Sequence, residues 1–476
     1  EFKSRPRHHS SETPADPCRG FVVLGPHDVV LGHSPFPDPI RPLRFPAMPA
    51  QAMAPSPTAF EPDAIVVGSG ATGGVAAMVL AEAGLRVLVL EAGPDLSARE
   101  AFGSEPLNTA RRLANMTSGK QRLQRHHPGF WKHNPNLFVD ERRNPYSTPD
   151  DAPFLWSRGR QVGGKSLTWG GITLRLSDYE FGAAEHDGQG AGWPIGSAEL
   201  APYYTRLEQL LEVHGACDGL PQLPDGHFQA PLPFTPGERH LQRRIGNELG
   251  LPLIHSRGFN LHRGAGWPRS ASQGRTLARA LATGRTQVRS NAVVSHLLLD
   301  GERAQGVVLV DGKTAARERI EAPLVVLCAS TIETLRILLH SSEAHQRGGL
   351  IDPSGSLGRY LMDHISSSRF FSIPDVPPPD QACELSGAGS CFIPNTVNLG
   401  GAQEDFHRGY GLWTALQRFD PPALLQRRRG EAVGFLIGHG EVLADASPGA
   451  SVQVQTPSGQ TVTGIVRNAT LVEVLL

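Results

Sequence analysis

The sequence predicts an α/β fold in which one parallel sheet is assembled from two segments that lie far apart in the chain. The first segment, residues 63–93, has a short apolar strand, closely spaced glycines and an Ala-rich helix. The second segment has an apolar strand at residues 324–327, then small residues and another helix. Strands that alternate with helices favour a parallel sheet with helices on its faces.

The first segment, DAIVVGSGATGGVAAMVLAEAGLRVLVLEAG, is expected to form a strand–helix–strand unit. The strands are predicted at residues 65–67 and 86–90, and the helix from about residue 73 to residue 83. Glycines in the spacing G-x-G-x-x-G separate the first strand from the helix, and Glu91 follows them by about 20 residues. This order is typical of a Rossmann-like dinucleotide-binding domain.

Each position of this fingerprint has a physical role in holding a dinucleotide. Gly68 permits a tight turn, Gly70 lets a pyrophosphate approach the backbone, and Gly73 lets the helix pack closely on the strand. The N-terminus of the helix offers N–H groups to the phosphates, and Glu91 is placed to accept hydrogen bonds from ribose hydroxyls. We therefore expect cofactor contacts from Gly68, Gly70, Gly73, Gly74 and Glu91. The alternative is a strand–turn–helix without a ligand, and the fingerprint alone does not distinguish FAD from NAD.

The second segment returns to the same sheet after about 200 residues of other sequence. The stretch TQVRSNAVVSHLLLDGERAQGVVLV, residues 286–310, alternates like antiparallel strands around a turn at Asp300 and Gly301. A buried strand at residues 324–327 and a helix from about Thr331 follow. Because NAD dehydrogenases usually complete their sheet in sequence, this interruption favours a FAD enzyme over an NAD-linked dehydrogenase.

In these features the chain resembles the glucose-methanol-choline (GMC) flavin oxidoreductases. The resemblance covers roughly residues 64–445 and rests on several further stretches: NPYSTPDDAPFLWSRGRQVGGKSLTWGG with RLSDYEF after it, GWPIGSAELAPYYTRLEQLL, CASTIETLRILLHSS and GSLGRYLMDHI. It implies bound FAD and a small-molecule alcohol, sugar or polyol, whose CH–OH group is oxidised by hydride transfer to the flavin. The electron acceptor stays open.

The resemblance also assigns further cofactor contacts. The GRQVGG stretch lies along the FAD pyrophosphate and flavin in the family, with Trp169, Gly170 and Gly171 near the flavin ring. A strand residue whose backbone meets adenine corresponds to Val294. The contacts implied are Arg160, Gly163, Gly164, Ser166 and Val294. Sugar oxidases of the family attach FAD covalently to a His where this chain has Thr168, so FAD is expected to be non-covalent. A glycine-rich loop without a ligand is the alternative.

The catalytic base is the component of the family pattern that the sequence does not show. In the family, a His near the C-terminus takes the hydroxyl proton, and the run that contains it is not found here. His439 is a weak candidate, and a structural role is the alternative for both His439 and His364. The alternative for the whole chain is a truncated or fused gene product that binds FAD without catalysing the reaction.

The expected organisation is a Rossmann-like FAD-binding domain built from discontinuous segments, with an incomplete α+β substrate domain. The tail alternates apolar and polar residues around Pro457, Ser458 and Gly459, which predicts a hairpin and a third short strand. Met48 or Met53 could be the natural start, and a processed targeting segment is the alternative for the residues before it. The predicted divisions are a disordered Pro-rich leader (1–59), a first FAD-binding segment (60–180), a helical and loop insertion with cap and substrate-side elements (181–285), a second FAD-binding segment (286–366), the start of the substrate domain (367–446) and a β-rich tail (447–476).

Composition excludes several other classes. The formal net charge is −1, so we expect no nucleic-acid partner, and no apolar run is long enough to span a bilayer. The five cysteines form no C-x-x-C pair, which argues against a disulfide framework and a zinc site. No spacing of His residues suggests a metal. Without a recognisable signal peptide, a cytoplasmic location is expected.

Overall fold

The computed structural model describes most of the chain from residue 60 onward. The described residues are 54–55, 60–148, 154–188, 192–260, 266–301, 303–344, 352, 357–359, 364–399, 408–419, 431–441, 451–455, 461–468 and 471–474. Within these ranges no helix combines the length and the apolar character needed to cross a membrane. The leader predicted at residues 1–59 lies almost wholly outside them, and so does the predicted turn at Pro457, Ser458 and Gly459.

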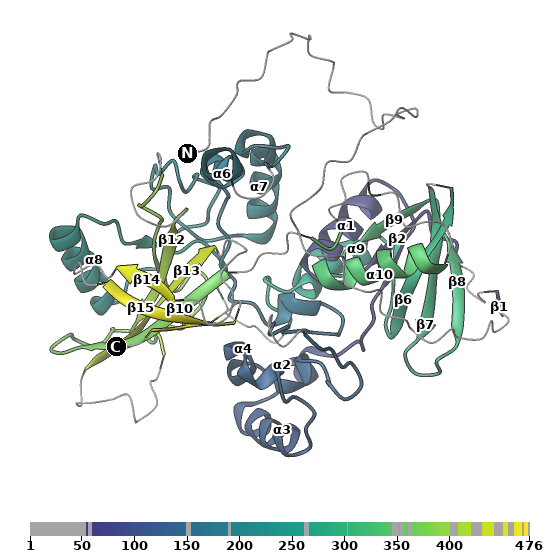
Figure 1. The fold of residues 1–476 in the computed structure, drawn as a ribbon, viewed down its shortest axis with the longest axis horizontal. Helices are drawn as coiled ribbons and strands as arrows, with labels where there is room; N and C mark the ends of the chain where they lie inside the picture. The colour runs from purple at the N-terminus through teal and green to yellow at the C-terminus, as the bar shows by residue number, and fades with distance from the viewer. Residues whose placement is uncertain are drawn as a thin grey trace, which may run out of the picture. The chain divides into compact units, whose positions relative to one another are not determined.

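The first of the sheets is a parallel sheet of four strands (Figure 1). Its strand order is β5 (Thr286–Arg289), β3 (Val87–Leu90), β2 (Ala64–Val67) and β9 (Leu324–Leu327). Neighbouring strands pair in parallel throughout, with Ile65 opposite both Leu88 and Val325. The sheet therefore joins residues near 65 with residues near 325, as the two apolar strands of the sequence predict.

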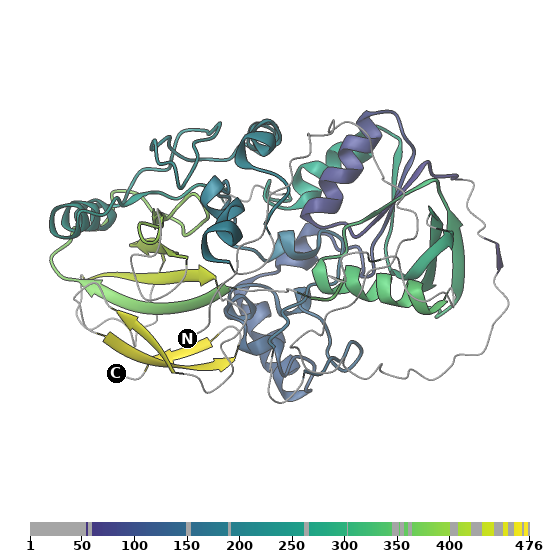
Figure 2. The ribbon, with the colours of Figure 1, turned by 45° about the horizontal axis from the view of Figure 1, so that its top comes forward.

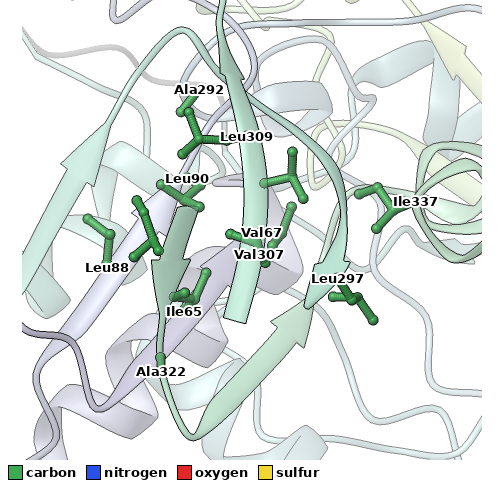
Figure 3. Close-up of a cluster of buried hydrophobic side chains, with 12 residues drawn as sticks. Ile65, Val67, Leu88, Leu90, Ala292, Leu297, Val307, Leu309, Ala322 and Ile337 are labelled. Carbon is green, nitrogen blue, oxygen red and sulfur yellow. The ribbon is translucent and has the colours of Figure 1, made fainter. Parts of the chain in front are cut away.

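Both faces of this sheet are covered, which explains why its central strands are continuous apolar runs. On one face, Val66 and Val89 pack against α1 (Ala71–Glu82) and α9 (Thr276–Ala282), which lie side by side in Figures 1 and 2. On the other face, Ile65 and Leu90 meet a second sheet and α10 (Thr331–Ala344), as Figure 3 shows. Successive residues of β2 thus point to opposite cores.

The second sheet carries the antiparallel strands that the sequence predicts on either side of residues 300–301. It contains β6 (Ala292–Asp300), β7 (Arg303–Asp311) and β8 (Arg317–Glu321), with the short β1 (Ala54–Pro55) parallel to β8. The prediction is wrong at one end of the stretch, because Thr286–Arg289 is not antiparallel. It pairs in parallel with β3 at the edge of the first sheet.

A third sheet of five strands forms a separate antiparallel layer (Figure 1). Its order is β10 (His364–Ile373), β13 (Ala432–Glu441), β12 (Tyr410–Leu416), β11 (Cys391–Ile393) and β4 (Ile254–His255). The tail forms the antiparallel strands β14 (Ser451–Gln455), β15 (Thr461–Asn468) and β16 (Leu471–Val474).

Helices fill the long segments between the sheets. The stretch GWPIGSAELAPYYTRLEQLL contains α7 (Ser197–Leu211), as expected. The others are α2 (Ala98–Phe102), α3 (Glu105–Thr117), α4 (Pro128–Lys132), α5 (Asp178–Phe181), α6 (Ala183–Asp187) and α8 (Pro236–Leu249), with 3₁₀ turns at Gln124–His126, Pro135–Leu137, Gly164–Leu167 and Ser272–Gly274.

Candidate functional site

The glycine loop between β2 and α1 is shaped by steric demands that differ at each glycine. Gly68 has φ +99°, and a Cβ there would lie 2.4 Å from the carbonyl oxygen of Cys328. A Cβ on Gly73 would lie 1.9 Å from the carbonyl oxygen of Gly68. At Gly70, in contrast, the nearest atom to such a Cβ is 3.9 Å away. Gly68 and Gly73 are therefore needed for the tight turn, while Gly70 faces open space.

The N-terminus of α1 has the properties of an anion site. Gly70 is its N-cap residue and provides no side chain to bond the first N–H groups. The first turn contains no acidic residue. Unbonded N–H groups and the positive end of the helix dipole attract phosphate. Gly74 lies one turn into the helix, where a Cβ would be 2.4 Å from Oγ1 of Thr276, so it permits the close packing of α1 on α9.

Glu91 lies at the carboxyl end of β3, buried beside the loop with 7% of its surface exposed. Its Oε2 accepts hydrogen bonds from the Ser69 hydroxyl at 2.6 Å and the Ser69 N–H at 3.1 Å, and its Oε1 accepts from the Gly93 N–H at 3.0 Å. Burial raises the pKa of this carboxyl, and the bonds from Ser69 and Gly93 oppose the rise. A carboxylate has about four acceptor sites, so these three bonds leave capacity for a ligand hydroxyl.

The second glycine stretch lies directly against the first. The Gly163 N–H donates to the Ser69 hydroxyl at 3.0 Å, and a Cβ on Gly164 would lie 3.4 Å from the Cα of Gly70. Gly163 has φ +91° and Gly164 has φ +50°, conformations that favour glycine. The two loops, some 94 residues apart in sequence, thus meet at the N-terminus of α1.

A third segment, which the sequence analysis did not single out, connects these loops. The Ser272 hydroxyl donates to the carbonyl of Ser69 at 2.7 Å, and its N–H donates to the Ser166 hydroxyl at 3.0 Å. Ser166 in turn donates to the carbonyl of Gly163 at 2.6 Å. The Gln273 amide donates to the carbonyl of Val162 at 2.6 Å. The hydroxyl of Ser166, expected as a cofactor contact, therefore already both donates and accepts within the protein.

Arg160 and the start of the strand that carries Val294 also lie close to Glu91. The Arg160 guanidinium donates to the Asn144 side chain. Burial lowers its pKa, and the nearby carboxylate of Glu333 opposes this. Val294 is buried on β6, and its carbonyl accepts a hydrogen bond from Arg336 at 3.0 Å. Arg160, Glu91 and the start of β6 therefore border one region, since the backbone of Glu91 also pairs with Ala292.

The residues after GRQVGG lead into a cavity of about 2560 Å³. Thr168, Trp169, Gly170 and Gly171 all line it. Trp169 is held by a hydrogen bond from its indole N–H to the carbonyl of Ser270 at 3.1 Å and by Phe259, whose ring centre lies 5.3 Å away. No described atom lies within 4 Å of a Cβ built on Gly170. The cavity extends from this point to the antiparallel sheet, through Ser366, Trp413 and Ile437.

Of the residues described, four histidines line the same cavity: His126, His127, His133 and His186. Nothing in the sequence marks these histidines, since the adjacent His126 and His127 lie in a polar loop without metal-ligand spacing and His133 and His186 each stand alone. His439 lies on β13 with its backbone paired to Ser366 on one side and Gly411 on the other. Both partners line the cavity. Among the residues that the structure describes, no group of three His, Cys, Asp or Glu side chains could hold a metal.

Comparisons with known proteins agree with this architecture. The family model described as GMC oxidoreductase matches residues 62–366. A 2-methyl-1,2-propanediol dehydrogenase from Mycolicibacterium austroafricanum is 30% identical over 65% of this chain and 56% of its own length. A paromamine 6'-oxidase from Streptomyces fradiae is 28% identical over 64% of this chain and 54% of its own. The fructose dehydrogenase large subunit from Gluconobacter japonicus is 24% identical over 63% of this chain and 58% of its own length. The chain thus spans a little over half the length of these curated relatives.

Proposed function

Because this chain belongs to the GMC oxidoreductase family, we propose that it binds FAD non-covalently and oxidises the CH–OH group of an alcohol, sugar or polyol. The observation that supports cofactor binding best is the open space at Gly70 beside the uncapped N-terminus of α1. A nucleotide phosphate fits that space in both size and charge. The buried carboxylate of Glu91, close to the same loop, suits the ribose hydroxyls.

The residues present fit the cofactor in shape as well. A side chain at Gly70 would enter the open space, whereas side chains at Gly68 and Gly73 would collide with backbone. Along the same path, Gly164 brings the second loop to within contact distance of Gly70. We assign the pyrophosphate to the N–H groups at the start of α1, the ribose to Glu91, and the flavin end to Thr168, Trp169 and Gly170.

Bound FAD would supply the acceptor for the hydride that leaves the substrate carbon. The chain's own residues must hold the substrate, exclude water and take the hydroxyl proton. The cavity beyond Thr168 offers room for the substrate. His439 stays the weak candidate for the base; its backbone pairs within β13, and its side chain lies outside what the structure describes. The three named relatives are a 2-methyl-1,2-propanediol dehydrogenase, a paromamine 6'-oxidase and a fructose dehydrogenase large subunit, and these names support a polyhydroxylated substrate.

The cofactor assignment is tested on purified protein. We expect it to be yellow and to release free flavin on acid precipitation, because Thr168 offers no nitrogen for the bond that a His makes in covalent relatives. Colour that stays in the pellet would contradict the non-covalent assignment. Colourless, folded protein that added FAD does not reconstitute would contradict FAD binding.

The oxidation is tested in the substrate half-reaction, without air and with a panel of sugars, diols and polyols. Bleaching of the flavin spectrum by one of them is the expected result, and His439→Gln should then slow it by about 10²–10⁴-fold. Intact binding of FAD with no bleaching by any alcohol would favour the second candidate, a FAD-binding chain without catalytic activity. The observation behind that second candidate is that the family run that carries the base is not found in this sequence.

A further inference from the structure

Lys165 places a cation on the wall of the large cavity. It lies in the 3₁₀ turn Gly164–Leu167, directly after the glycines that meet the N-terminus of α1. Lys165 lines the cavity of about 2560 Å³, and so do Ser157 and Thr168. Its surface is accessible, yet the protein around it lowers the pKa of its ammonium. Both properties are expected of a side chain that faces a cavity and can meet a ligand there.

The ammonium of Lys165 has no acidic partner among the residues that the structure describes. Its Nζ donates a hydrogen bond to the Ser157 hydroxyl at 3.1 Å. Burial is the cause of its lowered pKa, and no nearby carboxylate opposes it. A cation that is partly removed from water without a counter-ion costs free energy. An anionic ligand in the cavity would offset that cost.

The acids of the cavity wall are already engaged elsewhere. Within the described part of the chain, Glu180 and Asp187 are the acidic residues that line the cavity. Glu180 accepts hydrogen bonds from the N–H and the hydroxyl of Ser177, at 2.6 and 2.5 Å. Asp187 pairs with Arg408 at 2.8 Å. Neither carboxylate therefore neutralises Lys165, and the charge at this point of the wall attracts an anion.

Ser157 makes the position suitable for a carboxylate in particular. The ammonium of Lys165 has three N–H donors, of which Ser157 uses one. Because the Ser157 hydroxyl accepts from Lys165, its own proton can be donated to a ligand. A carboxylate has two acceptor oxygens, so both donors can bond to it at once. One ammonium matches one negative charge, which favours a carboxylate over a dianionic phosphate.

The position of Lys165 also suits a substrate more than the cofactor phosphates. Its carbonyl accepts a hydrogen bond from the Thr168 N–H at 3.0 Å, so it lies one turn from the residue to which we assign the flavin end. Gly70, Gly163 and Gly164, all of them described, are not part of the cavity lining. The side chain of Lys165 therefore faces the substrate cavity, while the proposed phosphate site lies at the glycines.

We propose that Lys165 and Ser157 bind a carboxylate of the substrate, so that the preferred substrate is a polyhydroxylated carboxylic acid. This inference rests on the proposed function and extends it, because it names the class of alcohol and the residues that select it. The carboxylate anchors one end of the molecule, and a CH–OH group further along the carbon chain lies toward Thr168.

The test is calorimetric titration of the full chain, saturated with FAD, with gluconate and with sorbitol. These six-carbon polyols differ at one end, where gluconate has a carboxylate and sorbitol a hydroxymethyl group. The wild type should bind gluconate at least about tenfold more tightly, since its bonds to Lys165 involve charged groups. Lys165→Met should weaken gluconate binding by about tenfold to hundredfold and leave sorbitol binding unchanged. Ser157→Ala should weaken gluconate binding about fivefold.

Two further lysine variants serve as controls. Lys165→Arg keeps the charge and should retain a preference for gluconate, which a merely structural role would not explain. Lys313→Met, on the exposed turn between β7 and β8, should bind both polyols like the wild type. All variants should keep the wild-type melting temperature and FAD content.

Equal binding of the two polyols by the wild type, no binding of gluconate, or unchanged gluconate binding by Lys165→Met would overturn the proposal. Loss of FAD from folded Lys165→Met would also overturn it, because Lys165 would then hold the cofactor. The proposed oxidation fails separately. Binding that depends on the carboxylate, without bleaching of the flavin by gluconate or by any alcohol, would contradict the oxidation and leave this inference standing.

Discussion

Glu91 joins two tasks in one side chain. Its carboxylate orders the glycine loop through Ser69 and Gly93, and it is the candidate partner of the ribose. Replacing it with Ala removes an ionised acceptor, and a hydrogen bond to a charged group contributes about 1.5–3 kcal/mol. We expect Glu91→Ala to weaken FAD binding about tenfold to hundredfold in a titration of apoprotein. Glu248→Ala, on the exposed end of α8, should leave the affinity unchanged. An unaltered affinity in Glu91→Ala would place the ribose partner elsewhere.

The effect of Glu91→Ala on the free energy of unfolding should depend on pH. Burial raises the pKa of Glu91 above the ordinary value for a glutamate, so the folded apoprotein binds this proton more tightly than the unfolded chain. The stability that the group contributes is therefore present in full below its unfolded pKa and is lost as pH rises through its folded pKa. The difference in unfolding free energy between wild type and Glu91→Ala should favour the wild type most at low pH. Urea unfolding across a pH series would measure it, and a difference that grows with pH would contradict the raised pKa.

At the scale of elements, substitutions of two glycines in the β2–α1 loop should distinguish an effect on FAD binding from an effect on folding. A Cβ at Gly70 meets no atom closer than 3.9 Å, whereas one at Gly73 would lie 1.9 Å from the carbonyl of Gly68. Gly70→Ala should therefore keep its melting temperature but bind FAD at least about tenfold more weakly. Gly73→Ala should lose about 1–3 kcal/mol of stability, the usual cost of overpacking. Thermal unfolding and FAD titration of both variants check this. Equal stability of the two would show that the helix can shift away from the loop.

These elements were also the most predictable region of the fold. Local sequence is sufficient to predict the strand–helix–strand unit, since the glycine spacing, the apolar strands and the helix all lie within residues 63–93. The direction of strand β5 was predicted wrongly, because it depends on a distant partner strand and not on local sequence. Thr286–Arg289 is an edge strand in which only Thr286 is buried. Its apolar and polar residues therefore alternate as they would in an antiparallel strand. Only its partner, β3, makes it parallel.

At the scale of the whole molecule, the site depends on contacts that no local pattern encodes. Ser272 bonds Ser69 across 203 positions of sequence, and Gln273 bonds Val162 across 111. Serine and glutamine are common in loops, so nothing in their own neighbourhood marks them as partners of a glycine fingerprint. The sequence therefore offers Gly68, Gly70, Glu91, Gly163 and Gly164 as candidate cofactor contacts, but it does not indicate the side chains that bring them together. The same limit applies to the cavity, whose walls come from segments between residues 123 and 437.

A cofactor that binds where these distant segments meet should stabilise them as one unit. FAD at about a hundred times its dissociation constant adds about 2.7 kcal/mol to the folded state, which should raise the melting temperature by several degrees. Hydrogen exchange should slow in β2 and α1 and also in β9, because β2 and β9 pair residue by residue and Gly68 packs against the backbone of Cys328. Gly70→Ala, which is expected to fold normally, should show smaller effects at the same FAD concentration, because a tenfold weaker affinity leaves about 1.4 kcal/mol of the stabilisation. Protection confined to residues 64–90 would mean that the cofactor site does not extend across the sheet to the second segment.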